Sequence, residues 1–279
     1  MVTDTAEFVY DSSQGRPPLV SELRNMWNYR GLLRLLVARD LTLRYKRSVL
    51  GVGWTFLNPL LTSLVMWLIF SQIFERQARE EIPFIVYLLS GLTLVNFFSQ
   101  GVVSSGASIV SSRGIITKVF VPPEIFSFSA SVSSGVNFLI MMIPLLGLQL
   151  LTGVGIPWTV FLVVIPAIFL LATVAGLGLA LASLAVHFYD VLEMTKVLAM
   201  LMTWMVPTFY TEEMIPDRFW PIIQANPLYS YLVVFRGFVF GGEFAPWWNF
   251  VVMFGFTAFS LALGAWVFSR SWKTVVGKL

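Results

Sequence analysis

The stretch WTVFLVVIPAIFLLATVAGLGLALASLAV, Trp158 to Val186, runs for 29 residues without a charged side chain. The hydrocarbon core of a bilayer takes about 20 apolar residues per helix, so this stretch predicts a helix that crosses a membrane with some tilt. The whole chain agrees: 57% of its 279 residues are hydrophobic, 12% are charged and the mean hydropathy is +0.79. A soluble domain is about one quarter charged, so the composition predicts an integral membrane protein.

Small residues recur along this stretch on one helix face. Ala172, Gly176 and Ala180 are spaced four residues apart, and Gly178 and Ala182 lie on the neighbouring row. Small side chains at this spacing let two helix backbones approach closely inside a membrane. The pattern predicts a tight contact between helices and not a ligand site.

Five further stretches are long and apolar enough to span a membrane. With the opening stretch fourth in order, they are Trp54 to Phe74, Ile82 to Val103, Ile125 to Leu151, Val191 to Tyr210 and Trp248 to Phe268. The predicted fold is all-α, with six transmembrane helices. Two segments follow from it: a cytoplasmic N-terminal segment with an interface helix over residues 1–53 and a membrane domain over residues 54–279.

Residues 211–247, between the fifth and sixth spans, combine apolar runs with four prolines and several acids. Backbone at membrane depth must stay hydrogen-bonded or be buried in protein. This favours short re-entrant helices that dip into the outer leaflet and return, with an ordinary extracellular loop as the alternative.

Basic residues gather on one side of the predicted spans. Fourteen of the 18 Lys and Arg residues precede the first span or follow the second, fourth or sixth, while four lie on the other side together with seven acids. Cytoplasmic segments carry the excess of Lys and Arg, so both termini are predicted to be cytoplasmic. In the fifth span, Glu193 and Lys196 are spaced to pair on one face at the membrane boundary; contact with substrate headgroups is the alternative.

Several kinds of chemistry are excluded or disfavoured. The chain has no Cys and a single His, His187, which excludes disulfides, thiolate nucleophiles and paired His ligands. It has no Gly-x-x-x-x-Gly-Lys-Ser/Thr loop for ATP and no row of acids or His within the spans for proton relay. His187 fits a membrane boundary better than a catalytic role, and nucleic-acid binding is disfavoured. These features predict a transport subunit, not an enzyme, that takes its energy from a partner.

Three motifs resemble the membrane subunits of ABC-2 type polysaccharide exporters, the Wzm-like permeases that export O-antigen or galactan. They are RDLTLRYKRSVLGVGW (Arg39–Trp54) followed by Asn58-Pro59-Leu60, SRGIITK (Ser112–Lys118) with Pro122, and PTFY (Pro207–Tyr210) with Asn226-Pro227-Leu228 and Arg236. The chain departs from the family at Pro123, where Arg is frequent, and at Ser111 or Ser112, where Asn is frequent. The resemblance extends from about Leu32 to the end of the chain.

The resemblance implies an assembly of two copies of this chain with two copies of an ABC ATPase, which would bind ATP and Mg. Located in the bacterial cytoplasmic (inner) membrane among membrane lipids, it would move a polysaccharide linked to polyprenyl diphosphate outward. An ABC-2 permease for teichoic acid, a glycolipid or a drug is one alternative. A membrane enzyme acting on lipid-linked sugars is the other, and the absence of a carboxylate cluster disfavours it.

The resemblance also implies roles for residues on the cytoplasmic side. Leu32 to Arg47 would form an interface helix on the ATPase, although Arg39 lies close to the leucine side of its helical wheel. The predicted coupling residues are Arg39, Asp40, Arg113, Lys118 and Glu124. The basic residues Arg44, Lys46 and Arg47 would hold anionic headgroups or a pyrophosphate, with general membrane anchoring as the alternative.

Aromatic residues are candidates for the transport pathway, because sugar rings present apolar C–H faces that pack on aromatic planes. The alternative is that they face lipid or the protein core, as most aromatic residues of membrane proteins do. The predicted channel-lining residues are Trp67, Phe70, Asn96, Phe97, Phe98, Gln100, Trp204, Phe209 and Tyr210.

Overall fold

The structure is a computed structural model that describes residues 29–46, 48–73, 82–118, 121–241 and 244–278. All regular elements among these residues are helices, which confirms the predicted all-α class. The main helices are α2 (Arg30–Tyr45), α3 (Gly53–Ile73), α4 (Phe84–Ser111), α5 (Arg113–Ile116), α6 (Glu124–Leu151), α7 (Val164–Ala185), α8 (Asp190–Trp204), α9 (Trp220–Ala225), α10 (Pro227–Phe240) and α11 (Trp247–Lys278). Short 3-10 helices are η1 (Trp158–Val163), η2 (Glu212–Met214) and η3 (Asp217–Phe219).

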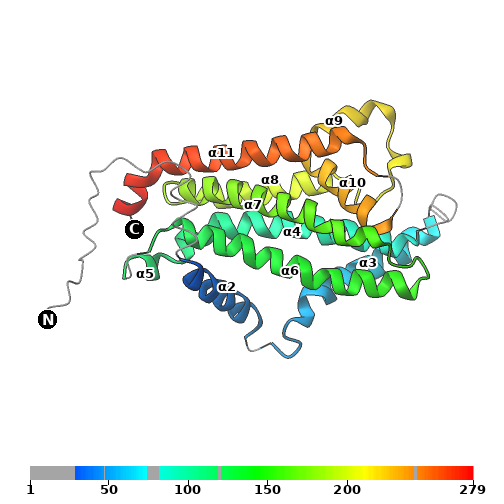
Figure 1. Ribbon diagram of the computed structural model, residues 1–279, viewed down its shortest axis with the longest axis horizontal. Helices are drawn as coiled ribbons and strands as arrows, with labels where there is room; N and C mark the ends of the chain where they lie inside the picture. The colour runs from blue at the N-terminus through cyan, green and yellow to red at the C-terminus, as the bar shows by residue number, and fades with distance from the viewer. Residues whose placement is uncertain (1–28, 47, 74–81, 119–120, 242–243, 279) are drawn as a thin grey trace.

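The long helices α4, α6, α7 and α11 run side by side, as Figure 1 shows. The short helices lie at opposite ends of this bundle: α2 and α5 at one end, here called the α2 end, and α9 and α10 at the other, here called the α10 end (Figure 1). The bundle therefore has one end with the basic sequence motifs and one with the re-entrant region predicted from the sequence.

Among the described residues, five helices are long and apolar enough to cross a membrane by length and composition. They comprise residues of α3, α4, α6, α11 and the continuous η1–α7 segment. The predicted fifth span is different: α8 has 15 residues, about 22 Å at 1.5 Å per residue. A crossing at this place, and hence the count of six spans, stays a prediction.

The end of the fifth predicted span was placed wrongly. We predicted a span to Tyr210, whereas α8 ends at Trp204 and residues 205–210 bend irregularly. Pro207 explains the difference, because proline removes a backbone donor and disfavours helical geometry in the residue before it. The carbonyl groups around this break consequently need partners from outside the helix.

The predicted contact of small residues is confirmed, and its partner is α11. A Cβ atom on Gly176 would lie 2.5 Å from the carbonyl oxygen of Ser260, and one on Gly264 would lie 2.3 Å from the carbonyl oxygen of Gly176. On another side of α7, a Cβ on Gly178 would lie 2.3 Å from that of Ser105 on α4. Glycine thus lets α7 pack closely against both neighbours.

The helices differ strongly in how deeply they are buried. In the apolar segment that is long enough to cross a membrane, 72% of α4 is buried inside the chain, against 11% of α3. Helix α10 is also embedded, with ten of its 14 residues buried. Short helices are thus present in the region between α8 and α11 where the sequence predicted them; their depth in a membrane stays a prediction.

Candidate functional site

A polar cavity of about 440 Å³ lies between α3 and the pair formed by α4 and α6. Its lining combines an arginine, amides and hydroxyls with a few apolar groups. The lining residues are Arg44, Tyr45, Trp54, Thr55, Asn58, Pro59, Thr62, Leu92, Thr93, Asn96, Phe97, Gln100, Ser134, Asn137, Phe138 and Met141.

A second cavity of about 220 Å³ continues from the first beside α2 and shares Arg44, Ser134 and Asn137 with it. Its other lining residues are Arg39, Asp40, Leu41, Ser104, Ser108, Ser111, Ser112, Phe126, Ala130 and Ser133. Because they share a wall, the two cavities form one feature, here called the polar trough.

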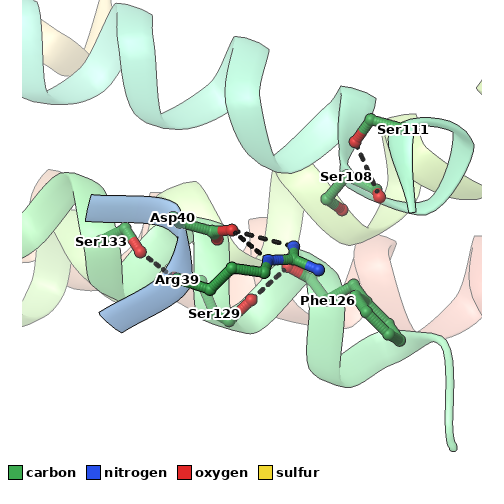
Figure 2. A network of polar contacts seen from close by, with 7 residues as sticks. All are labelled: Arg39, Asp40, Ser108, Ser111, Phe126, Ser129 and Ser133. Atoms are coloured by element: carbon green, nitrogen blue, oxygen red, sulfur yellow. Dashed lines mark hydrogen bonds and ion pairs between the residues drawn. The ribbon is translucent and has the colours of Figure 1, made fainter. Parts of the chain in front are cut away.

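Helix α2 packs on the start of α6 through an apolar cluster beside the trough. Leu36 is buried against Ile125 and Phe126 at the start of α6. One turn later, Arg39 donates from Nη2 and Nε to Asp40 Oδ1 at 2.9 and 3.2 Å. Figure 2 shows this pair together with serines of α4 and α6. Charged residues lie beside the leucine side of α2 because the helix covers a polar surface next to its leucine contact. This explains why the helix is imperfectly amphipathic.

Three hydrogen bonds join the end of α2 to the other walls of the trough. Arg44 Nη2 donates to Gln100 Oε1 on α4 at 3.1 Å. The Tyr45 hydroxyl donates to Asn137 Oδ1 on α6 at 2.7 Å and is hydrogen-bonded to the Thr55 hydroxyl on α3. These contacts hold α2, α3, α4 and α6 around a common space.

The Arg44 guanidinium keeps donors available in this space. It is exposed, and no carboxylate of the described residues forms an ion pair with it. A guanidinium has five N–H donors in a planar fork that fits phosphate or carboxylate oxygens. The trough can therefore hold an anion at Arg44.

Serine hydroxyls form much of the remaining surface. Ser108 donates to the Ser105 carbonyl at 2.6 Å. Ser133 donates to the Ser129 carbonyl at 2.8 Å, as Figure 2 shows. A hydroxyl that donates to its own helix keeps lone pairs free to accept from a second group. The trough can thus accept hydrogen bonds from water or from the hydroxyls of a sugar.

These serines were missed in the sequence, although a signal was present. Ser104, Ser108 and Ser111 recur at intervals of four and three residues, which places them on one face of α4. Ser133, Ser134 and Asn137 provide the matching spacing on α6. A polar stripe within an apolar span indicates a buried interface or a cavity, and both are present: the Ser105 and Ser131 hydroxyls also bond across α4 and α6 at 2.7 Å.

The predicted headgroup and coupling residues fall into two groups. Arg39, Asp40 and Arg44 line the trough. Lys46 is exposed just beyond α2, Arg113 is exposed on α5, and Lys118 is exposed after α5, while Glu124 is half-buried in the first turn of α6. Arg47 lies outside the described residues. The structure thus brings three of the eight together, and the roles of all eight stay predictions.

The predicted channel residues also separate. Asn96, Phe97 and Gln100 line the trough. Phe98 is buried in the core. The remaining residues lie on α3 and around the end of α8, with Trp67 and Trp204 exposed and Phe70, Phe209 and Tyr210 half-buried. Their role in a pathway stays a prediction.

Two smaller predictions concern the boundary at the α2 end. Lys196 Nζ donates to Glu193 Oε1 at 2.6 Å with both side chains exposed, so the predicted pair on α8 is confirmed. The His187 Nδ1 atom lies 3.0 Å from the Ser183 carbonyl oxygen. The histidine is thus engaged with the end of its own helix.

The sequence profile of the ABC-2 type transporter family matches residues 31–240. The O-antigen export system permease protein RfbA of Myxococcus xanthus is 30% identical over 220 residues, 78% of this chain and 84% of that protein. An RfbA of Klebsiella pneumoniae is 28% identical over 216 residues, 76% and 81% of the two chains. The capsule polysaccharide export inner-membrane protein CtrC of Neisseria meningitidis serogroup A is 22% identical over 235 residues, 82% and 86%.

The matched range runs from α2 to the end of α10 and so contains the whole trough. It covers about three quarters of the sequence. The chain belongs to the ABC-2 type transporter family.

Proposed function

We propose that this chain is the membrane-spanning permease subunit of an ATP-binding cassette exporter that moves a lipid-linked polysaccharide from the cytoplasm outward. Family membership and the relatives' names, O-antigen export and capsule polysaccharide export, support polysaccharide as the cargo. The bacterial cytoplasmic membrane, with the α2 end facing the cytoplasm, is the proposed location, since the excess of basic residues lies on that side.

The polar trough is the observation that carries the proposal. A sugar joined to a lipid through a diphosphate combines an anion with many hydroxyls. Arg44 supplies free donors for the anion, while serine and amide groups on α4 and α6 suit the hydroxyls. We propose that the diphosphate and the first sugar of the substrate bind in the trough.

The lipid tail of such a substrate needs an apolar surface next to the trough. Helix α3, which forms one wall, exposes an apolar face that includes Leu61, Leu64 and Leu68. Burial of each CH₂ group of a tail against lipid or this face is worth about 0.8 kcal/mol. The headgroup can therefore enter the trough while the tail stays in the bilayer.

Energy would come from a partner. In the proposed assembly, two copies of this chain bind two ABC ATPase subunits, which hold ATP and Mg. We propose that Arg113 and Lys118, which are exposed on and just after α5 at the α2 end, contact acids on the ATPase. Arg39 and Asp40, by contrast, are better placed to sense the content of the trough than to contact the ATPase directly.

The test is the substitution Arg44→Gln in the complex with the ATPase, with Arg34→Gln as the matched control. Arg34 is exposed on the same helix and does not line the trough. Hydrogen bonds to charged groups are worth about 1.5–3 kcal/mol. Arg44→Gln should therefore raise the concentration of lipid-linked glycan that half-maximally stimulates ATP hydrolysis about ten- to hundredfold.

Arg34→Gln should leave this concentration nearly unchanged. Equal effects of the two substitutions would show that Arg44 contributes only general positive charge. A glycolipid without a diphosphate serves as a second comparison: stimulation as strong as by the diphosphate-linked glycan would favour a permease for a different cargo.

A further inference from the structure

Arg236 on α10 is a charged side chain buried at the α10 end, where it contacts the part of α4 that precedes the trough-lining residues Leu92 and Thr93. Its side chain is 8% exposed, and no carboxylate of the described residues forms an ion pair with it. Instead, Nη1 donates to the Pro207 carbonyl at 2.8 Å, Nε to the Ser90 hydroxyl at 3.1 Å and Nη2 to the Tyr87 carbonyl at 3.1 Å. The guanidinium also lies over the Tyr87 ring, 3.6 Å from its centroid. We call Arg236, Tyr87, Ser90 and Pro207 the Arg236 cluster.

The cluster supplies partners for the broken end of α8. The helix stops before Pro207, and buried carbonyl groups at a helix end require donors. Besides Arg236, the Tyr87 hydroxyl lies 3.1 Å from the carbonyl oxygens of both Pro207 and Tyr210. Asn226 Nδ2 donates to the Met202 carbonyl at 2.8 Å. Asn226 therefore binds the last turn of α8, while Arg236 and Tyr87 bind the segment that directly follows this helix.

Helix α10 is itself fixed at both ends. At its start, Asn226 Oδ1 accepts from the Leu228 backbone N–H at 3.1 Å. At its other end, the Gln149 side chain donates to the Val239 carbonyl and the Thr159 hydroxyl donates to the Phe238 carbonyl, both at 2.8 Å. Arg236 thus extends from a firmly held helix.

Most of the rest of α8 is exposed in the single chain. Only Thr195 and Ala199 are buried along this helix, whereas Val197, Leu198 and Leu201 are each about half exposed. The polar contacts made by Asn226 with Met202 and by the Arg236 cluster with the segment after Trp204 therefore lie at one end of the helix.

We propose that Arg236 is a positioning residue for transport, which holds the end of α8 on α4 and α10 so that α8 tilts about this end when the ATPase moves its other end. This inference rests on the proposed function of an ATP-driven exporter. A helix fixed at one end converts displacement at its free end into rotation. Without the fixed end, the helix slides and the same displacement is lost, so ATP hydrolysis continues while export falls.

The test compares Arg236→Lys with Arg218→Lys in the complex with the ATPase. Lysine keeps the charge, but its N–H donors all lie on one nitrogen and cannot reproduce the planar fork that reaches three separate acceptors. Arg218 is an exposed arginine near the same end of the bundle. Arg236→Lys should raise the number of ATP molecules hydrolysed per exported polymer roughly two- to thirtyfold, the range expected when coupling between packed elements is lost. Arg218→Lys should leave this ratio unchanged.

A second measurement follows α8 directly and needs no substrate. The chain has no native cysteine, so Leu201→Cys on α8 and Val251→Cys on α11, both at exposed positions, can carry a single pair of spin labels in complexes diluted with unlabelled chains. Arg236→Lys should broaden the distribution of distances between the two labels. Tyr87→Phe keeps the aromatic ring but removes the hydroxyl, and it should broaden the distance distribution less. If the Arg236→Lys complex does not assemble, the distances are measured in the Tyr87→Phe complex instead.

Unchanged distances and an unchanged ATP-to-polymer ratio in both cluster variants would overturn the proposal. A lower yield of assembled protein with the ratio and the distances preserved would also overturn it, because it would assign Arg236 a role in stability alone. If the unaltered complex is not stimulated by lipid-linked glycan, the proposed function fails, whereas the label distances still decide whether Arg236 holds α8.

Discussion

Helix α4 meets two different surroundings along its length. At the α10 end, Tyr87 and Ser90 bind a buried arginine. Toward the α2 end, Gln100 and Ser104 face a cavity and the end of a largely exposed helix. Both surroundings contain an arginine bound to a polar group of α4 at 3.1 Å, yet one arginine is buried and the other is exposed. Burial and not the type of contact therefore distinguishes the rigid end from the end that has room for a ligand.

Adding volume at the rigid end should have the largest effect. A Cβ on Gly91 would lie 2.8 Å from Thr208 Cγ2 and 2.9 Å from Arg236 Nη2. Gly91→Val should therefore lower the free energy of unfolding by about 3 kcal/mol, the upper part of the usual range for overpacking. The control is Gly147→Val on α6, where no atom lies within 4 Å of an added Cβ. Unfolding by SDS in mixed micelles measures both, and equal losses would contradict a close fit around Arg236.

Part of this contrast was predictable from the sequence. The row containing Gly176 has a helical period, and Pro207 interrupts an otherwise apolar run, so both features are visible locally. The structure adds that the row packs on α11, and it ends α8 at Trp204 where the sequence predicted a span to Tyr210. Local patterns indicate which helix face carries small residues and where a helix is interrupted. They do not indicate which other helix packs there.

The positions of the functional side chains were less predictable. Arg236 was recognised as part of a motif, but its acceptors are separated from it by up to 149 residues in the sequence. Similarly, Arg39 and Asp40 lie on the face of α2 that covers α4 and α6. The helical period of α2 does not predict this placement, because the direction of each side chain depends on how α2 packs on α6 through Leu36.

The same substitution at two tyrosines tests the two surroundings of α4 separately. Tyr87→Phe removes a hydroxyl donor from the Tyr210 carbonyl, while the Pro207 carbonyl still accepts from Arg236. A buried group left unsatisfied costs about 1–3 kcal/mol. Tyr45→Phe removes the hydroxyl that binds Asn137 in the trough, where water can replace it at little cost. We expect Tyr87→Phe to destabilise the protein by about 1–2 kcal/mol and Tyr45→Phe by less than about 1 kcal/mol.

Glycan-stimulated ATP hydrolysis is a second measurement that distinguishes the effects of the two tyrosine substitutions. Tyr45→Phe should change the glycan concentration for half-maximal stimulation while the protein stays folded. A larger loss of stability from Tyr45→Phe than from Tyr87→Phe would mean that the trough, and not the Arg236 cluster, is the rigid part of α4's surroundings.

The smallest expected effects come from double-mutant cycles on the two arginine contacts of α4. One cycle combines Arg236→Met with Ser90→Ala, and the other combines Arg44→Met with Gln100→Ala. Side-chain hydrogen bonds between membrane helices couple by about 0.6 kcal/mol on average and up to about 1.7 kcal/mol, and the buried contact of Arg236 belongs in the upper part of that range. The exposed contact of Arg44 should couple by less than about 0.5 kcal/mol, because water competes for both groups. Since both bonds are 3.1 Å long, equal coupling energies would exclude burial as the cause of the difference between the two ends.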